Sequence, residues 1–381
     1  MLANHIIVLD AVRAKKNQAF KKDLCQQTGL SWGTLCKTVD SLLAGGYLNS
    51  RKERVSRPGR PIVPLGVEGS AACFAGMDVG AEHTRVLFAD LNLEPLFQQE
   101  VPTPRYTDPE PFYAWLTGVY NAALAASGVA CERVRTLGLS VSGNVDSEHG
   151  VIVSGGNFGM AFGANLPVSA LASRLGVPVF AMSTQVAAVW AEYQFGICAG
   201  YGNLVNIGLG VGIGSGIVAN HVLLYSHPKR PVGYIGHILI PGNDHICSCG
   251  FKGCLEAYSG GDYLVGIARE RFPQRLELHG AAELDRAAAA GDADAQAVLD
   301  TAAAYNAVGV AAMIQLYAPD ALIFSGRQSR ADGYVYQRTI AELKGILPRE
   351  RRNCYIGITS LGAYQSALGA MRLGYEHWEL A

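Results

Sequence analysis

Three cysteines and one histidine lie within 18 consecutive positions of the chain, a density typical of a metal site. Zinc prefers a tetrahedral shell of thiolates and imidazole, and a closed shell of four protein ligands holds a structural ion. Gly250 and Gly253 allow the tight backbone turns that bring such ligands around one ion. The alternative is three core cysteines beside an unrelated histidine. The spacing favours structural zinc, with the ligands His237, Cys247, Cys249 and Cys254.

The same segment resembles a family signature. Residues 233–237 read Gly-Tyr-Ile-Gly-His, and residues 247–256 follow the pattern Cys-x-Cys-Gly-x-x-Gly-Cys-x-Glu. This combination resembles the signature of the ROK family, which contains sugar kinases and sugar-responsive transcriptional repressors. The resemblance extends from about residue 5 to about residue 375, and it implies that the four ligand positions hold zinc.

The overall composition indicates a folded protein of more than one domain. A length of 381 residues is enough for two or three domains, and 49 % hydrophobic against 17 % charged residues allows sizeable cores. We find neither an uncharged apolar run of 18 residues nor a secretory signal, so we expect no membrane association. Nine cysteines, an odd number, favour a reducing cytoplasm over a disulfide framework.

Charge is divided unevenly along the chain. Residues 1–70 hold 11 Lys and Arg and 5 Asp and Glu, a net charge of +6, whereas the remainder carries −7. A basic head on an acidic body favours a nucleic-acid-binding module joined to a separate domain. A small domain with a basic face by chance is the alternative, which charge alone does not exclude.

The first 70 residues have the pattern of a helix-turn-helix domain. Apolar residues at helical spacing predict three helices, and glycines at 45–46 end the third. The turn at 28–31 supplies an N-cap to the third helix, which would read the major groove of double-stranded DNA. Trp32 could equally cover the core. We expect DNA contacts from Ser31, Trp32, Thr34, Lys37 and Thr38.

A two-stranded wing is predicted after the third helix, with arms at residues 47–50 and 62–65. Between the arms, residues 57–61 read Arg-Pro-Gly-Arg-Pro. Arginines beside Pro-Gly in an extended backbone fit the narrow minor groove of A·T-rich DNA, and ROK repressors have a similar Gly-Arg-Pro there. We therefore expect Arg57, Gly59 and Arg60 to contact DNA, against the alternative of a solvated wing tip.

Residues 71–381 alternate short glycine-ended strands with helices, which predicts an α/β body. Helices are expected at 111–126, 185–195, 299–317 and 363–375. The resemblance implies an actin-like (ribonuclease H-like) body of two lobes around a cleft, each with a five-stranded mixed sheet. Sequence repetition is too weak to derive that duplication. A glycine run at 208–216 would let backbone N–H groups approach a phosphate or a sugar.

Four kinase motifs implied by the resemblance are altered. The first phosphate loop places Glu82 where the family has a hydroxyl, and the second places Val211 where it has threonine. Arg327 replaces a glycine of the adenosine motif, and Thr184 replaces the catalytic aspartate. A threonine hydroxyl titrates far too high to act as a general base at neutral pH. These changes together predict a protein without catalytic residues that is not an enzyme.

The resemblance also places an effector pocket in the cleft. Asn157, His237 and Glu256 match sugar-contacting positions, whereas Thr184 and Tyr234 replace two carboxylates. Loss of both carboxylates weakens a usual hexose site and removes repulsion against an anionic ligand such as a sugar phosphate or sugar acid. The alternative is a vestigial pocket in a body that only dimerises.

These observations predict a cytoplasmic transcription regulator that represses carbohydrate-related genes. It would bind an operator through the winged helix-turn-helix and a sugar or sugar derivative through the body, as a homodimer or a dimer of dimers. Two rivals remain open: an ATP-dependent sugar kinase with a DNA-binding head, and a regulator controlled by a protein partner.

Overall fold

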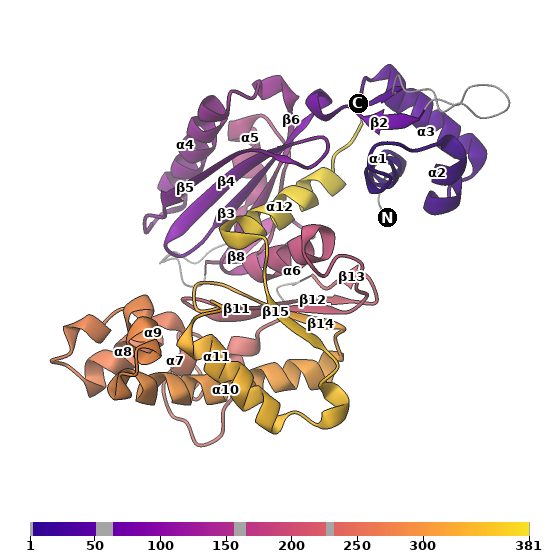
Figure 1. The fold of residues 1–381 in the computed structure, drawn as a ribbon. Helices are drawn as coiled ribbons and strands as arrows, with labels where there is room; N and C mark the ends of the chain where they lie inside the picture. Colours follow the sequence, from indigo (N-terminus) through magenta and orange to yellow (C-terminus); the bar gives the residue numbers. More distant parts are fainter. Residues whose placement is uncertain (1–2, 51–63, 156–164, 226–231, 381) are drawn as a thin grey trace.

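The computed structural model describes residues 3–50, 64–155, 165–225 and 232–380 (Figure 1). A small head at the N-terminus is attached to a body of two lobes, and both ends of the chain lie beside the head. The α/β body and the winged head are those expected from the sequence. The boundary near residue 70 stays a prediction.

The head has the predicted three helices followed by a two-stranded wing. Gly29 ends the second helix with a φ of 68°, and the Ser31 hydroxyl caps the third by accepting the N–H of Thr34 at 3.2 Å. The second wing strand lies at 65–67, later than the expected 62–65, and residues 62 and 63 lie outside the described part. The elements are α1 (Asn4–Ala14), α2 (Lys21–Thr28), α3 (Trp32–Ala44), β1 (Leu48–Ser50) and β2 (Leu65–Val67).

The upper lobe, called the N-lobe here, is built on a five-stranded sheet in the order β10-β6-β3-β4-β5. Strands β3, β4 and β5 pair antiparallel, whereas β6 and β10 add in parallel on the other side of β3. Helices α4 and α5 cover one face, and α12 covers the other. The elements are β3 (Cys73–Val79), β4 (His83–Asp90), β5 (Pro95–Pro102), α4 (Pro109–Ser127), β6 (Val134–Val141), α5 (Val168–Leu175), β10 (Val179–Ser183) and α12 (Gln365–Glu376).

The lower lobe, called the C-lobe, repeats this pattern with a second sheet in the order β13-β12-β11-β14-β15. Again three strands pair antiparallel and two add in parallel. Because the two sheets share this pairing pattern, the structure shows that the two lobes are duplicates of one fold, which the sequence did not reveal. The elements are α6 (Thr184–Phe195), β11 (Leu204–Leu209), β12 (Ile213–Ala219), β13 (Val222–Leu223), α7 (Glu256–Ser259), α8 (Gly261–Arg271), α9 (Ala281–Ala289), α10 (Ala293–Tyr317), β14 (Ala321–Ser325), α11 (Tyr334–Ile346) and β15 (Tyr355–Ile358).

Smaller elements lie in the connections between these helices and strands. Three short strands form a separate sheet beside the N-lobe, in the order β7-β8-β9. These are β7 (Asn144–Asp146), β8 (Val151–Ser154) and β9 (Leu166–Pro167). The 3-10 helices are η1 (Gly69–Ala71), η2 (Cys131–Arg133), η3 (Ile235–His237), η4 (Leu276–Leu278), η5 (Arg349–Arg351) and η6 (Gly362–Tyr364).

Helices α6 and α12 form the contact between the lobes, and glycines bring their backbones together. A Cβ on Gly369 of α12 would lie 1.8 Å from the carbonyl oxygen of Ala187 in α6. A Cβ on Gly138 of β6 would lie 1.6 Å from the carbonyl oxygen of Ala370. Contacts this short admit no side chain, so α12 is held tightly between the N-lobe sheet and α6.

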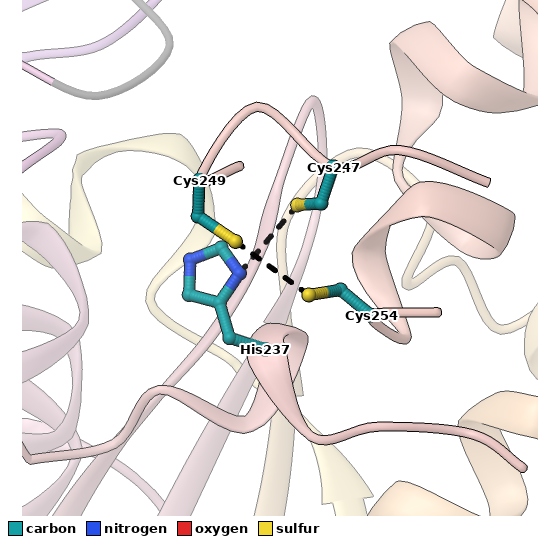
Figure 2. Close-up of side chains that lie close together, drawn as sticks. All are labelled: His237, Cys247, Cys249 and Cys254. Atoms are coloured by element: carbon teal, nitrogen blue, oxygen red, sulfur yellow. Dashed lines mark hydrogen bonds between the residues drawn. The ribbon is translucent and has the colours of Figure 1, made fainter. Parts of the chain in front are cut away.

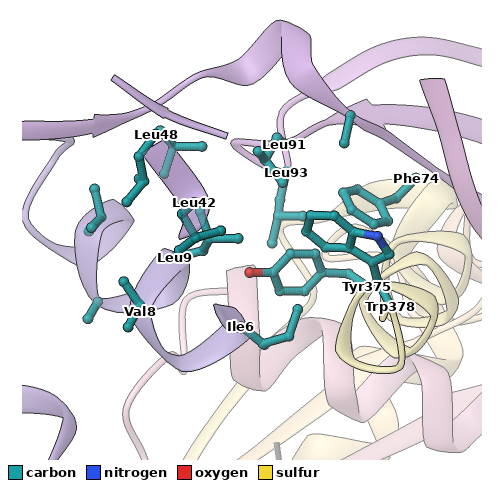
Figure 3. Close-up of a cluster of buried hydrophobic side chains, with 14 of the residues drawn as sticks. Ile6, Val8, Leu9, Leu42, Leu48, Phe74, Leu91, Leu93, Tyr375 and Trp378 are labelled. Carbon is teal, nitrogen blue, oxygen red and sulfur yellow. The ribbon is translucent and has the colours of Figure 1, made fainter. Parts of the chain in front are cut away.

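One hydrophobic core extends from the head into the N-lobe (Figure 3). Trp378, just after α12, lies 5.1 Å from the Tyr47 ring and 5.5 Å from the Phe74 ring, and it also contacts His5 of α1. Rings at this spacing in edge-to-face arrangements add to the stability gained by burial. The head is therefore packed onto the end of α12 rather than tethered to it.

Buried charges reinforce this junction between the head and α12. Arg372 of α12 is 4 % exposed and contacts Asp10 of α1 at 2.7 Å and Glu376 at 2.8 Å. Arg13 of α1 pairs with the same aspartate and donates to the hydroxyl of Tyr375 at 2.6 Å. Burial alone would raise the pKa of Asp10, but the hydrogen bonds and charges of the two arginines outweigh it and lower that pKa.

Within the described residues, α10 is the single helix that is long and apolar enough to cross a membrane by length and composition. Of its most apolar window, 56 % is buried inside the protein. That burial fits a core helix.

Candidate functional site

The four residues of the expected metal site converge at the edge of the C-lobe (Figure 2). One ligand atom from each of His237, Cys247, Cys249 and Cys254 lies within 4.8 Å of all the others. The sulfurs of Cys249 and Cys254 are 3.6 Å apart, and Nδ1 of His237 lies 3.7 Å from the sulfur of Cys247. Two sulfurs bound to one tetrahedral zinc lie about 3.8 Å apart, so the set has the size and the donor chemistry of a zinc shell.

Tight turns hold the metal loop in this shape, as the glycine positions predicted. Gly250 and Gly253 have φ angles of 89° and 79°, in the left-handed region that favours glycine. Ile240 donates to the carbonyl of Gly253 at 2.8 Å, which fixes the start of the loop against its end. The loop thereby carries Glu256, two residues after the last cysteine, into the space between the lobes.

A cavity of about 560 Å³ occupies the cleft between the lobes. Its lining includes Asp78 and Ser142 from the N-lobe and Thr184 at the start of α6. From the C-lobe, Tyr234, His237 and Glu256 line the same cavity. The structure therefore brings together four of the five expected effector residues, namely Thr184, Tyr234, His237 and Glu256, whereas Asn157 lies outside the described residues.

Thr184 belongs to a cluster of hydroxyl groups around a buried carboxyl at the cleft floor. Ser140 donates to Asp78 at 2.7 Å, and Thr184 contacts the same carboxyl oxygen at 3.3 Å. Ser142 lies 3.4 Å from the Thr184 hydroxyl. Burial raises the pKa of Asp78, against the opposing hydrogen bonds and the charge of Arg85. The cleft floor is thus polar, and its side chains make most of their hydrogen bonds with one another.

Glu256 and Tyr234 present different chemistry to the cavity. Glu256 is 5 % exposed, and one of its oxygens accepts the backbone N–H of Ile213 at 2.7 Å. Tyr234 is 39 % exposed, its ring centre lies 5.7 Å from that of His237, and burial raises the pKa of its hydroxyl. One carboxylate that accepts hydrogen bonds beside an open aromatic face suits a polyhydroxylated ligand.

The glycine run lines the cleft cavity, with Gly208, Gly210, Gly212 and Gly214 in its wall, and it also has a packing role. Three of its glycines lie against Gln185, the second residue of α6. A Cβ on Gly208 would lie 2.1 Å from the Gln185 amide nitrogen, and one on Gly216 would lie 2.0 Å from the Gln185 carbonyl oxygen. The absence of side chains at these glycines lets α6 pack closely against the C-lobe sheet. No local pattern pointed to Gln185, because its partners lie on strands more than 20 residues away.

On the head, the expected DNA residues fall into three groups. Lys37 is exposed and Trp32 is 55 % exposed, so the tryptophan lies outside the buried core of the head. The hydroxyls of Ser31 and Thr34 bond to each other at 2.8 Å, and that of Thr38 donates to the carbonyl of Thr34. Arg57, Gly59 and Arg60 of the wing lie outside the described residues.

The family model described as the ROK family matches residues 74–376. The chain belongs to the ROK family. It is similar to a xylose repressor of Caldicellulosiruptor bescii, with 22 % identity over 337 residues that cover 86 % of this chain and 83 % of the relative. A glucokinase of Streptomyces coelicolor is 30 % identical over 207 residues, covering 53 % of this chain and 62 % of the enzyme.

The fold of this ROK protein also matches a solved structure described as a ROK family transcriptional regulator and a homologue of the E. coli MLC protein. The TM-score is 0.79, and the match covers 97 % of this chain and 96 % of the other at 20 % identity. The likeness includes the head as well as the body, so the whole architecture is that of a known ROK fold.

Proposed function

We propose that this ROK protein is a transcriptional repressor that binds DNA through its head and responds to a sugar or sugar derivative in its cleft. The observation that carries the proposal is the winged head, packed through a buried core onto a body that has Thr184 at the catalytic position. The repressor relative, similar over most of both chains, supports it. The predicted reducing cytoplasm agrees with this role.

The DNA-binding part of the proposal rests on α3 and the wing. Lys37 and Trp32 are exposed on α3, where a helix inserted into a major groove meets phosphates and base edges. Ser31 at the cap of this helix, and Thr34 and Thr38 within it, can make further contacts while their present hydrogen bonds persist. Arg57, Gly59 and Arg60 would reach an adjacent minor groove. A homodimer, or a dimer of dimers, would place two heads on a pseudo-palindrome.

The effector part of the proposal rests on the cleft. Glu256 would accept hydrogen bonds from sugar hydroxyls, Tyr234 would stack on a pyranose face, and Thr184 would contribute a neutral hydroxyl at the floor. His237 would hold the metal beside the same cavity, and Asn157 would complete the contacts. With Thr184 and Tyr234 in place of carboxylates, a sugar acid or sugar phosphate meets less repulsion.

Helix α12 offers a physical route from the cleft to the DNA. Ser366, at its start, donates to the backbone carbonyl of Thr184 at 3.3 Å. Arg372, near its end, pairs with Asp10 of the head. A ligand that shifts the start of α6 would therefore shift α12 and the head with it, and so change the spacing of two heads in a dimer.

The metal is proposed to be structural zinc, held by His237, Cys247, Cys249 and Cys254. Four protein donors leave no open position for substrate, and a bound ion would fix the loop that carries Glu256. Metal analysis of the purified protein should give about one zinc per chain. Cys249→Ser should lower that value, whereas Cys131→Ser, an exposed cysteine elsewhere, should not. Equal zinc content in both variants would refute the assignment.

An ATP-dependent sugar kinase is the second candidate function, favoured by the glucokinase relative. Against it stand Thr184, which lacks a basic group, and Glu82, a carboxylate that takes the place of a hydroxyl in the phosphate loop. A coupled assay of ATP consumption over a panel of sugars tests this directly. Turnover above that of a Thr184→Val variant would establish the enzyme and overturn the regulator as the sole function.

The decisive experiment selects genomic fragments that bind the purified protein and then measures affinity by fluorescence anisotropy. Lys37→Ala should weaken DNA binding by about tenfold. It should also reduce, by about 1, the slope of the logarithm of the binding constant against the logarithm of the salt concentration. Lys344→Ala, in the C-lobe, should change neither quantity. Arg60→Ala should cost about 1–3 kcal/mol and relax the preference for A·T flanks. No selected fragment, or equal binding by all variants, would refute the DNA assignment.

Calorimetry with neutral sugars and with their phosphorylated or oxidised forms tests the cleft. Glu256→Gln keeps an acceptor for the Ile213 N–H and removes the charge, so it isolates the role of the carboxylate. Binding unaffected by this variant and by Tyr234→Ala would refute the pocket. Operator release by a protein fraction without any small ligand would support control by a protein partner.

A further inference from the structure

Two of the altered motif positions lie far apart in the sequence but form one contact in space. The carboxylate of Glu82 and the guanidinium of Arg327 are 2.5 Å apart. Glu82 lies in the N-lobe, in the turn between β3 and β4, and Arg327 lies in the C-lobe directly after β14. Within the described part of the chain this is the one ion pair that joins the two lobes.

The pair lies at the border between two cavities. One is the cleft cavity described above, and the other has a volume of about 630 Å³ and is bounded by α8, α9 and the loop after β14. Glu82 and Arg327 line both cavities, together with Gly210, Val211 and Gly326. The contact between α6 and α12 holds the lobes together at the cleft floor, and this ion pair holds them together farther out.

Both partners are attached to firm backbone. The carbonyl of Glu82 accepts the N–H of Thr103 at 2.9 Å, which fixes the turn to the edge strand β5. Gly326 has a φ of 90°, and a Cβ there would lie 2.3 Å from the Leu209 carbonyl oxygen. The side chain of Gln328, the next residue after Arg327, donates to the carbonyl of Gly210 at 2.7 Å. Because each backbone is held within its own lobe, a change in the ion pair acts on the distance between the lobes.

We propose that Glu82 and Arg327 form an inter-lobe clasp that biases the cleft toward its closed arrangement. The side chains are 50 % and 59 % exposed, so water and salt compete for both charges. An exposed pair shifts an equilibrium by up to about fivefold, which is enough to bias the cleft and too little to lock it. Removal of either charge leaves the other exposed to solvent, so the clasp opens without disturbing the core.

Hydrogen exchange followed by mass spectrometry tests the clasp on the full chain. Glu82→Gln and Arg327→Gln should each speed exchange by about two- to fivefold in peptides that cover residues 79–84 and 209–214. The double variant Glu82→Arg with Arg327→Glu should restore the slow exchange, because the pair re-forms with reversed signs. Arg338→Gln, which breaks exposed pairs on α11 with Asp300 and Glu342, should leave these peptides unchanged.

A salt titration provides a second readout. Raising NaCl from 0.05 to 1 M should speed exchange of the same peptides in the parent and in the charge-swapped variant, and should have little effect in Glu82→Gln. Far-ultraviolet circular dichroism and the unfolding midpoint should match among all variants. Parent-like exchange in both single variants, or a charge swap that fails to slow exchange below the single variants, would overturn the clasp.

Discussion

Helix α12 contacts the head at one end and the cleft-lining residue Thr184 at the other, and the head junction and the cleft differ physically. At the head, Arg372 is nearly buried between two carboxylates, and Trp378 lies among aromatic rings. At the cleft, the lobes are bridged by the exposed pair of Glu82 and Arg327 beside open cavities. Buried ion pairs are costly to break, whereas exposed pairs exchange with water at little cost.

This difference indicates where the molecule can change shape. The head and α12 share one core and one buried ion network, so we infer that they move as a unit. Among the described residues, the lobes share a tight contact along α6 and α12 and face the cleft cavity beside it. A ligand in the cleft can thus change the weak contact between the lobes, and the strong junction between α12 and the head then transmits the movement.

The largest expected effect comes from breaking the buried ion network between the head and α12. Arg372→Ala leaves the buried carboxylate of Glu376 without its partner and removes one of the two arginines that pair with Asp10, so it should lower the free energy of unfolding by about 3–5 kcal/mol. Urea unfolding followed by tryptophan fluorescence measures it. Arg338→Ala removes exposed pairs and should cost less than about 1 kcal/mol. Similar losses in both variants would contradict the comparison.

A smaller effect is expected where α12 meets α6. Gly369→Ala places a methyl group against the Ala187 carbonyl and should cost about 1–3 kcal/mol, because the two helices must separate. Gly118→Ala in α4 meets nothing within 4 Å and should stabilise by about 0.5–1 kcal/mol. Thermal unfolding of the Gly369→Ala and Gly118→Ala variants measures the difference in their stability. If both variants stabilise the protein, the helix contact is looser than described.

The smallest effect on stability is expected at the cleft floor. Thr184→Val keeps the shape of the side chain and removes a hydroxyl whose contacts with Asp78 and Ser142 are 3.3 and 3.4 Å long. It should cost about 0.5–1 kcal/mol, since Ser140 still donates to Asp78 at 2.7 Å. Ser140→Ala should cost more. The same urea titrations rank the two variants, and the reverse order would show that Thr184 is the main support of Asp78.

Local patterns were sufficient to predict much of this architecture. Apolar spacing placed α3, which begins at Trp32 after the Ser31 cap, and the helix expected at 363–375 is α12 at 365–376. The metal loop was predictable because its ligands are close in sequence and its glycines take the turns that the ligands require. The α/β class followed from alternating strands and helices, and the family model confirms the resemblance.

Contacts between distant segments could not be predicted in this way. Asp10 and Arg372 are 362 residues apart, and neither lies in a pattern that points to the other. The glycine run lines the cleft, as a surface for phosphate or sugar would, but its close contact with Gln185 is visible only in the packing of α6 on the sheet. From the sequence, Glu82 and Arg327 are alterations of two separate kinase motifs, and only the fold shows that they are in contact.

The junction between α1 and α12 also has a consequence during synthesis. The ribosome makes α1 before α12, so Asp10 must wait for Arg372, 362 residues later, which at bacterial or eukaryotic elongation rates takes about 20–70 s. Throughout that interval the face of α1 that carries His5 and Asp10 has no partner from the body. The head therefore emerges from the ribosome before the body and is among the last parts to complete its packing.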